Sequence, residues 1–434
     1  MKSLRVLIIF LCVFGFAKLA AAAPPKVVFV RCGKLIYDTE KPPIANAGVV
    51  ITDGKITAVG ADVTSPSGAQ QIDLSQYTVL PGLIDAHTHL WTGPFGATPS
   101  AGLGLLRATK AVDYAVRSGI VGMRILGSEN FIDVALRDAI DEGTIPGPHI
   151  VPCGHAISII GGHGDFVNMP VQFPLVDYYT PLNGFINSPD DAEKAVHLQI
   201  KYGAKVIKVL ASGGVLSPLD SPTAEQVSPE ELRVIVEQAH MDHLKVAAHA
   251  ENLTTILAAL HAGVDSIEHG SELDQEAIDY MNSHRTTLVP TVYIVDNIMT
   301  NGAKMHMPPW VLRKANEVGT KQINSYKMAL RNNVFMAAGS DQSYEPGKGT
   351  VRDEIMAEVK FGMTPEQALT SATKHSAQLV GLDDLGTVAV GKEGDLVAVQ
   401  GDPLSDIHVL ENVKAIVYQG SSLAPMNHSK GAGE

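Results

Sequence analysis

The stretch Thr78-Val79-Leu80-Pro81-Gly82-Leu83-Ile84-Asp85-Ala86-His87-Thr88-His89 contains the pattern that decides the fold. Its apolar first half predicts a buried strand, and two histidines follow at alternate positions where that strand ends. Because successive side chains of a strand point to opposite faces, His87 and His89 lie on one face and can bind one metal ion. Two histidines at this spacing can also simply decorate a strand, so the interpretation depends on the rest of the chain.

The middle of the chain, residues 81–384, alternates strand-like and helix-like stretches. The first strand is expected at 79–86, and seven further apolar runs follow it at 119–124, 149–152, 205–210, 245–249, 266–269, 287–291 and 334–338. Helical stretches such as 228–243 and 251–262 separate these runs. Eight strand–helix units predict an α/β fold and, within that class, a closed (β/α)8 TIM barrel. The rival open, doubly wound sheet lacks its glycine-rich phosphate fingerprint after the first strand.

Both ends of the chain are rich in short strands. Residues 48–60 predict a hairpin that turns at Asp53-Gly54, and runs at 386–399 and 413–418 have a similar character. We therefore expect residues 23–80 and 385–422 to form one small β-sandwich domain built from both chain ends. Residues 423–434 are expected to be a flexible tail.

The first 22 residues predict a secretory signal peptide. Lys2 and Arg5 precede an apolar run at 6–16, and small residues at 19–23 offer cleavage sites. The run is too short to stay in a bilayer as a spanning segment. We expect an exported protein, periplasmic or secreted, with no membrane anchor after cleavage.

The composition is that of a packed globular enzyme, with 45% hydrophobic and 18% charged residues in a chain of 434. Loss of residues 1–22 would remove three positive charges and change the net charge from −13 to −16. So acidic a protein is a poor partner for nucleic acid. Cys32 and Cys153 would remain, and nothing in the sequence decides whether they pair.

Functional side chains of a TIM barrel lie at the C-terminal ends of its strands. The chemically capable residues at these ends are His87, His89, Lys208, His249, His269 and Asp341. Each alone has an ordinary explanation; an Asp after Gly-Ser, for example, often forms a turn. Their occurrence at the same end of different strands predicts a metal centre.

Lys208 indicates how many metal ions the centre holds. An ammonium has no lone pair for a metal, but burial near cations favours the neutral amine, which can add carbon dioxide. The resulting carbamate has two oxygens that can bridge two ions. The expected sharing places His87, His89 and Asp341 on the first ion, His249 and His269 on the second, and N6-carboxylated Lys208 between them. Two divalent ions are thus expected, with Zn²⁺ the best match to these ligands, although Mn²⁺, Co²⁺ or Fe²⁺ would also fit.

At these positions the chain resembles the amidohydrolase superfamily. The matching motifs are Pro-Gly-Leu-Ile-Asp-Ala-His-Thr-His, Val-Ile-Lys-Val, Ala-His-Ala-Glu, Glu-His-Gly and Ala-Gly-Ser-Asp. Within the superfamily it is most similar to the branch of Xaa-Pro dipeptidases (prolidases), carboxypeptidase-like enzymes and ochratoxin-degrading amidohydrolases. That closer likeness depends on residues 161–165, Gly-Gly-His-Gly-Asp, and residues 212–215, Ser-Gly-Gly-Val.

The resemblance implies a hydrolase that cleaves the amide bond to a C-terminal amino acid with a free carboxylate, by a metal-activated hydroxide. Xaa-Pro dipeptides and N-acyl amino acids such as ochratoxin A are the expected small-molecule or dipeptide substrates. Asp341 is expected to move the proton, and His163 to polarise the scissile carbonyl or hold the oxyanion. Arg124, His163 and Tyr293 are the candidate ligands of the substrate carboxylate. We also expect a homo-oligomer.

Other functions stay open at this point. The main alternative is a mononuclear relative, such as an imidazolonepropionase-like cyclic amidase or a deaminase, which would not need Lys208. A non-catalytic scaffold would typically have lost metal ligands, and none is missing here. Glu251, two residues after His249, is interpreted as a charge at the N-terminus of a helix.

Overall fold

The computed structural model describes residues 25–90, 100–165, 178–344 and 349–426. The predicted signal peptide, residues 1–22, lies outside these ranges, as do residues 427–434 of the predicted tail. None of the helices in the described ranges combines the length and the apolar character needed to cross a membrane.

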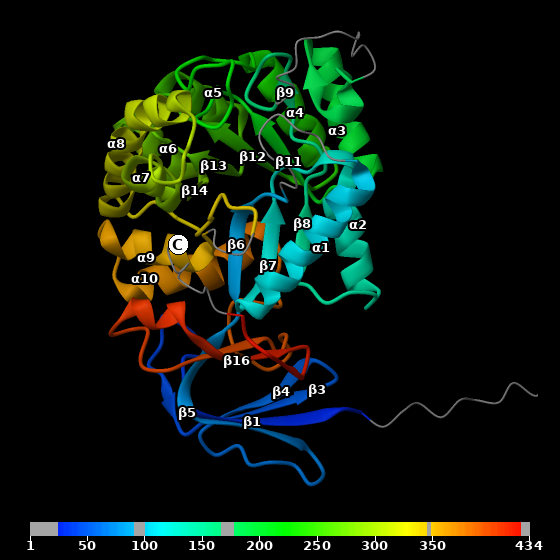
Figure 1. The fold of residues 1–434 in the computed structure, drawn as a ribbon, viewed down its shortest axis with the longest axis vertical. Coiled ribbons are helices and arrows are strands. Elements are labelled where there is room, and N and C mark those ends of the chain that lie inside the picture. The colour runs from blue at the N-terminus through cyan, green and yellow to red at the C-terminus, as the bar shows by residue number, and fades with distance from the viewer. Residues whose placement is uncertain (1–24, 91–99, 166–177, 345–348, 427–434) are drawn as a thin grey trace, which may run out of the picture.

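Strands from the two chain ends form one sheet, which lies apart from most of the helices (Figure 1). Its order is β17-β16-β15-β5-β1-β3-β4, with β2 paired to β1. The strands are β1 (Val27–Leu35), β2 (Ile44–Ala45), β3 (Gly48–Thr52), β4 (Lys55–Gly60), β5 (Gln70–Pro81), β15 (Leu396–Val399), β16 (Val413–Tyr418) and β17 (Ser421–Leu423). The described residues show this single sheet, and the second, facing sheet of a sandwich is not shown.

Seven parallel strands form the middle of the chain in two hydrogen-bonded groups. The groups are β6 (Leu83–Thr88), β7 (Ile120–Ile125) and β8 (His149–Pro152), then β11 (Val206–Leu210), β12 (Lys245–Ala250), β13 (Ser266–His269) and β14 (Thr287–Val289). Nearly all their residues are buried, as expected for parallel strands covered on both faces. This arrangement confirms the α/β class.

Backbone hydrogen bonds also connect the two groups with each other. The Lys205 N–H donates to Pro152 O at 2.7 Å, which joins β8 to the segment that leads into β11. At the other side, residues 335–338 lie between β14 and β6, since Leu288 N–H donates to Phe335 O at 3.0 Å and Ala86 N–H to Ala338 O at 2.9 Å. Backbone hydrogen bonds therefore connect each segment to the next in the order β6, β7, β8, β11, β12, β13, β14 and residues 335–338, and the last of these is bonded to β6 again.

Helices surround these parallel strands (Figure 1). They are α1 (Ala101–Arg117), α2 (Ile132–Asp141), α3 (Pro189–Lys201), α4 (Pro229–Met241), α5 (Leu253–Ala262), α6 (Gln275–His284), α7 (Val292–Asn301), α8 (Pro309–Arg331), α9 (Val351–Lys360), α10 (Pro365–Thr370) and α11 (Ser376–Val380). Short elements complete the chain: β9 (Ser158–Ile159), β10 (Phe185–Ile186), η1 (Glu129–Phe131), η2 (Pro181–Asn183), η3 (Ser371–His375) and η4 (Ile407–Glu411). Local sequence sets several helix starts; α4 begins with a capping box in which Ser228 and Glu231 each bond the other's backbone N–H.

The start of the predicted flexible tail makes defined contacts. Leu423 pairs with Ile416 in the small sheet, and the Met426 N–H donates to Arg117 O at 2.6 Å. Residues 423–426 therefore pack against the rest of the protein. Cys32 and Cys153 are both buried, unpaired thiols, so the structure contains no disulfide between them.

Candidate active site

Three predicted metal ligands converge at the C-terminal end of β6. The Nε2 atoms of His87 and His89 are 3.3 Å apart. Asp341 Oδ1 lies 3.5 Å from His87 Nε2 and 3.1 Å from His89 Nε2. All three atoms thus face one small volume, which is the arrangement expected of ligands for one ion.

Asp341 reaches this place because the chain after residue 338 is pinned to β6. Its N–H donates to His87 O at 2.8 Å, and its backbone adopts the left-handed region with φ 52°. The buried Asp85 carboxylate accepts hydrogen bonds from Ser340 N–H at 2.9 Å, Ser340 Oγ at 2.5 Å and Tyr344 Oη at 2.6 Å. A strained conformation of this kind persists only where such contacts hold it, and it is typical of functional sites.

A second pair of histidines lies beside the first group. His249 lies at the end of β12 and His269 at the end of β13, and their ring centroids are 4.6 Å apart. The ring centroid of His269 is 5.1 Å from that of His87. Each ring has one nitrogen held by the protein: His249 Nε2 donates to Gly213 O at 3.0 Å, and His269 Nδ1 is 2.7 Å from Thr291 Oγ1. The remaining nitrogen of each ring is left for a metal, in the manner usual for metal-binding histidines.

Lys208 lies near both groups, inside β11. Its side chain is 1% exposed, and its Nζ has no hydrogen-bond partner among the described residues. Burial, more than any other effect, lowers the pKa of Lys208 from 10.5 to about 8. A buried amine without a partner is costly, so this nitrogen is placed for a chemistry that the polypeptide alone does not complete.

The structure changes the expected role of Arg124. Its guanidinium is 1% exposed and donates to Ala86 O at 2.5 Å, Ser266 Oγ at 3.0 Å and Glu268 Oε1 at 2.8 Å. The other oxygen of Glu268 lies 2.7 Å from His87 Nδ1. Arg124 therefore neutralises the carboxylate that orients His87, and it is not available to bind a substrate carboxylate.

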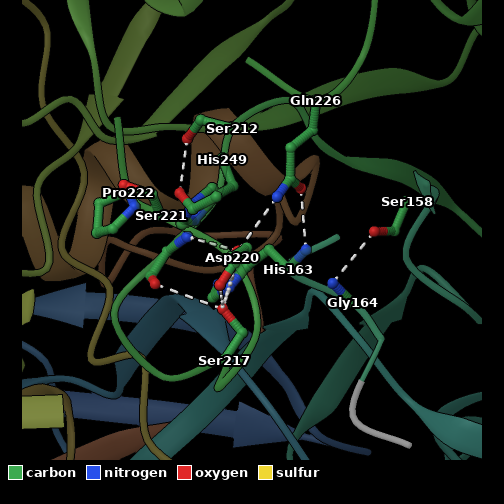
Figure 2. A network of polar contacts seen from close by, with 12 residues as sticks. Ser158, His163, Gly164, Ser212, Ser217, Asp220, Ser221, Pro222, Gln226 and His249 are labelled. Atoms are coloured by element: carbon green, nitrogen blue, oxygen red, sulfur yellow. Dashed lines mark hydrogen bonds and ion pairs between the residues drawn. The ribbon is translucent and has the colours of Figure 1, made fainter. Parts of the chain in front are cut away.

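The His163 ring, which follows β9, is held by a polar network of residues from the loop after β11 (Figure 2). Its ring stacks on His249 with centroids 4.3 Å apart, and its Nδ1 lies 2.7 Å from Ser217 Oγ. The Ser217 hydroxyl also donates to Asp220 Oδ1, which accepts a 2.8 Å bond from the buried Lys314 ammonium. Lys314 additionally donates to the carbonyl oxygens of Gly214 and Ser217, at 3.0 and 2.6 Å.

These contacts determine which nitrogen of a neutral His163 ring carries the proton. Asp220, paired with Lys314, is ionised and can only accept, so the single Ser217 proton is directed to it. Ser217 must then accept from His163 Nδ1–H, which leaves Nε2 as an acceptor. The expected donation from Nε2 to a carbonyl or oxyanion would require the imidazolium form of His163.

Tyr293 is the second residue of α7 and is half-buried. Its ring packs closely on Gly349, because a Cβ there would lie 2.2 Å from the ring. The N–H groups of Val292 and Tyr293 donate to the two oxygens of the buried Glu354, at 2.9 and 2.7 Å. Tyr293 follows β14 at the same end of the parallel strands as the metal ligands.

Glu251, for which the sequence predicts only a charge at the N-terminus of a helix, lies in the site. One oxygen of its buried carboxylate and one ring nitrogen each of His249 and His269 are all within 4.8 Å of one another. The Ser271 hydroxyl donates to Glu251 Oε2. Burial above all, with a contribution from the nearby Asp341, raises the pKa of Glu251 from 4.5 to about 7.

The residues present fit a pair of divalent ions. The structure contains two neighbouring clusters of histidine and carboxylate atoms. The unpartnered Lys208 amine is near enough to act electrostatically on His87 and Asp341 of the first cluster and on His249 and His269 of the second. Most of the histidines have their second nitrogen fixed by a protein oxygen, which is the support that metal ligands need. Nitrogen and oxygen donors together suit Zn²⁺ and similar ions.

Comparisons with known proteins agree with this geometry. Residues 78–423 match the amidohydrolase family. The ochratoxinase of Aspergillus niger is 33% identical over 433 residues, which cover 93% of this chain and 88% of that protein. A solved Xaa-Pro dipeptidase with methionine bound in its active site is 33% identical with a TM-score of 0.85, covering 92% of this chain and 99% of its own. A prolidase in complex with N-methylphosphonate-L-proline is 30% identical with a TM-score of 0.81, covering 92% and 100%.

The chain therefore belongs to the amidohydrolase family. The prediction of a hydrolase acting on amide or peptide C–N bonds is confirmed, as is the likeness to the branch with prolidases and ochratoxinase.

Several supporting residues were not identified from the sequence. They are Asp85, Ser217, Asp220, Glu251, Glu268, Thr291 and Lys314. Asp85, Glu251 and Glu268 had a usable signal, since each is a carboxylate within two residues of a predicted ligand and next to an apolar run. Lys314 had none, because it lies in a long helix rich in charged residues.

Proposed function

We propose that this protein is an exported amidohydrolase that uses two divalent metal ions, most suitably Zn²⁺, to hydrolyse the amide bond to a C-terminal amino acid with a free carboxylate. The observation that carries the proposal is the buried, unpartnered Lys208 amine close to two groups of histidine ligands. A mononuclear relative would have no use for it. Export rests on the pattern of residues 1–22.

In this proposal Lys208 becomes a shared ligand. Its neutral Nζ forms a bond to the carbon of carbon dioxide and loses one proton to water, and the product is a carbamate with two oxygens. His87, His89 and Asp341 would hold the first ion, and His249 and His269 would help to hold the second. A bound pair of divalent ions lowers the pKa of a water molecule to near neutrality and polarises a substrate carbonyl.

Asp341 is the proposed proton carrier. Burial works against its ionisation, but the neighbouring His87 and His89 hold the pKa of Asp341 below its usual value. The carboxylate is then available to accept a proton from the attacking water and to return it to the leaving amine. The same side chain thus serves as ligand and as acid–base group.

His163 and Tyr293 are the proposed substrate contacts. A neutral His163 offers Nε2 as an acceptor for a substrate N–H, whereas its imidazolium would bind a carboxylate or an oxyanion. Tyr293 offers a hydroxyl donor at the same end of the strands. Arg124 has no place in this list, since its partners are inside the protein.

The test is a panel of matched substrates with the zinc-loaded protein. Xaa-Pro dipeptides come first and N-acyl phenylalanine compounds, including ochratoxin A, come second, because relatives of this chain bear the names prolidase and ochratoxinase. Each compound is compared with its C-terminal amide. A carboxylate bound by a charged or strong donor contributes about 2–3 kcal/mol, so capping should lower kcat/KM about thirty- to a hundredfold.

Equal cleavage of free acids and amides would contradict the carboxylate requirement. A preference for a cyclic imidazolone, together with one ion per chain and an unmodified Lys208, would favour the mononuclear alternative. Tyr293→Phe separates the two candidate contacts, since it should reduce the preference for free acids only if the Tyr293 hydroxyl binds the carboxylate.

A further inference from the structure

The carboxylate of Glu251 has no role in helix α5, although it directly precedes that helix. Asn252 is the capping residue, and its side chain accepts the Thr255 N–H at 3.0 Å. Glu251 uses its backbone N–H to donate to Ser212 Oγ at 3.0 Å, while its side chain turns into the protein and is buried. The burial of a carboxylate that forms no direct ion pair with any described residue requires another explanation.

Alternation along the end of β12 explains where this side chain points. Residues two apart on an extended strand face the same side, so Glu251 and His249 face the site together. The described structure places a carboxylate oxygen of Glu251 within 4.8 Å of one nitrogen of His249 and one of His269. The Ser271 hydroxyl holds Oε2, as an outer partner does for a ligating carboxylate.

The two halves of the site become equivalent when Glu251 is included. The first group contains two histidines and one carboxylate, namely His87, His89 and Asp341. The second group, with Glu251, has the same composition. Without it, the second ion would have three protein ligands, His249, His269 and the shared Lys208, whereas the first ion would have four; Glu251 makes the two numbers equal.

The charge balance of the site also favours Glu251 as a metal ligand. Two divalent ions bring four positive charges into a buried site, and Asp341 and a carbamate on Lys208 balance two of them. Glu268 does not contribute, because its charge is paired with Arg124 at 2.8 Å. Glu251 is the further carboxylate at the second group, and its charge would be stabilised there by a metal ion.

We propose that Glu251 is a ligand of the second metal ion, together with His249 and His269. The inference rests on the proposed function, because it presupposes a metal pair. Each ion is then held by two histidines and one carboxylate, in addition to the shared Lys208.

The test measures ions rather than turnover alone. Wild-type protein and Glu251→Gln are loaded with Zn²⁺, dialysed against increasing concentrations of a chelator, and analysed for metal. We expect two ions in the wild type, and in the variant one retained ion and one whose affinity falls at least about tenfold. A second readout is the visible spectrum of the Co²⁺-loaded proteins, which should change when an anionic oxygen ligand is removed.

Two further variants serve as controls. Glu272→Gln removes a neighbouring carboxylate that is paired with Lys321 at 2.5 Å and is no member of either ligand group; its two ions should bind as in the wild type. Glu251→Asp keeps the charge on a shorter side chain, and its second ion should bind with intermediate affinity. This variant also keeps the test decisive if Glu251→Gln does not fold.

The outcomes separate the inference from the proposed function. Two ions bound to Glu251→Gln with wild-type affinity would overturn the ligand assignment and leave the metal pair intact. Unchanged metal binding with lost turnover would overturn it as well, since Glu251 would then act on the substrate. A wild type that never binds a second ion would overturn the proposed function itself.

Discussion

Replacement of Lys208 by Met is the sharpest test of the metal site, because its effect on stability should change sign with metal. Met has a similar length but no amine, so Lys208→Met removes the unpartnered Nζ without opening a large cavity. In metal-free protein the variant should be the more stable one. In metal-loaded protein the wild type should be.

The size of the metal-free effect follows from the burial of the ammonium. A pKa lowered from 10.5 to about 8 corresponds to about 3 kcal/mol of lost unfolding free energy at pH 7. The sign is that of a cation whose pKa is depressed by folding: the penalty is complete below about pH 8 and disappears as the pH rises towards 10.5. The advantage of Lys208→Met should therefore be about 3 kcal/mol at pH 7 and shrink above pH 8.

With metal present, the wild type gains binding energy that the variant lacks. An ion at a thousand times its dissociation constant stabilises the folded protein by about 4 kcal/mol. The variant should lose at least one ion and most of its activity. Wild-type protein supplied with ¹³C-labelled bicarbonate should show a carbamate ¹³C-NMR signal that Lys208→Met does not show.

The measurement is urea unfolding at pH 7 and pH 9, with chelator or with Zn²⁺. Lys245→Met is the control, since Lys245 donates to Gln378 O and Leu379 O at 2.9 and 2.7 Å and its loss should lower stability in both conditions. A metal-free Lys208→Met that is less stable than the wild type would refute the burial argument. Two ions and full turnover in the variant would refute the shared ligand.

Three further outcomes are expected. Asp341→Asn should lower kcat by at least about a hundredfold with a smaller loss of metal, because an amide cannot carry the proton; near-normal kcat would exclude Asp341 from proton transfer. Arg124→Met should lower the unfolding free energy by about 3–5 kcal/mol, measured in urea, because it leaves Glu268 buried and unpaired, while the preference for free-acid substrates stays unchanged; loss of that preference would restore Arg124 as a substrate ligand. Thr291→Val should weaken metal binding about ten- to a hundredfold in a chelator titration, since His269 Nδ1 loses its partner, and wild-type affinity would show that this contact does not position the ring.

The parallel strands lie closest to their expected positions where the apolar runs are long. Strands are expected at 205–210 and 245–249, and β11 and β12 lie there, because long apolar runs are a strong local signal. The single strand expected at 79–86 is divided in the structure: residues 79–81 end β5 of the small sheet, and β6 begins at Leu83. The arrangement of the strands from the two chain ends is harder to predict from sequence. These strands form one sheet, and how strands pair is decided by contacts between distant segments. Leu423 and Met426 illustrate the same limit, since their partners Ile416 and Arg117 cannot be read from a short Gly- and Ser-containing tail.

The site shows the same division. His87, His89 and Asp341 converge as expected, because alternation along a strand and the common end of parallel strands are rules of local geometry. Arg124 was misjudged, since a residue at the end of a strand can point to the site or into the protein. Only the presence of Glu268, 144 positions away, decides that it points inward.

The sequence by itself determined the class of fold, the type of chemistry and the six residues predicted to bind metal, because each depends on periodicity and residue type over a few neighbouring positions. The tertiary structure alone decided the partners of those ligands: Glu268 behind His87, Thr291 behind His269, and Glu251 beside His249. It also decided which nitrogen carries the proton of a neutral His163 ring, since that depends on Lys314 from a distant helix. The physical reason is that a hydrogen bond or an ion pair requires two groups within about 3 Å, and for groups far apart in the chain only folding sets that distance.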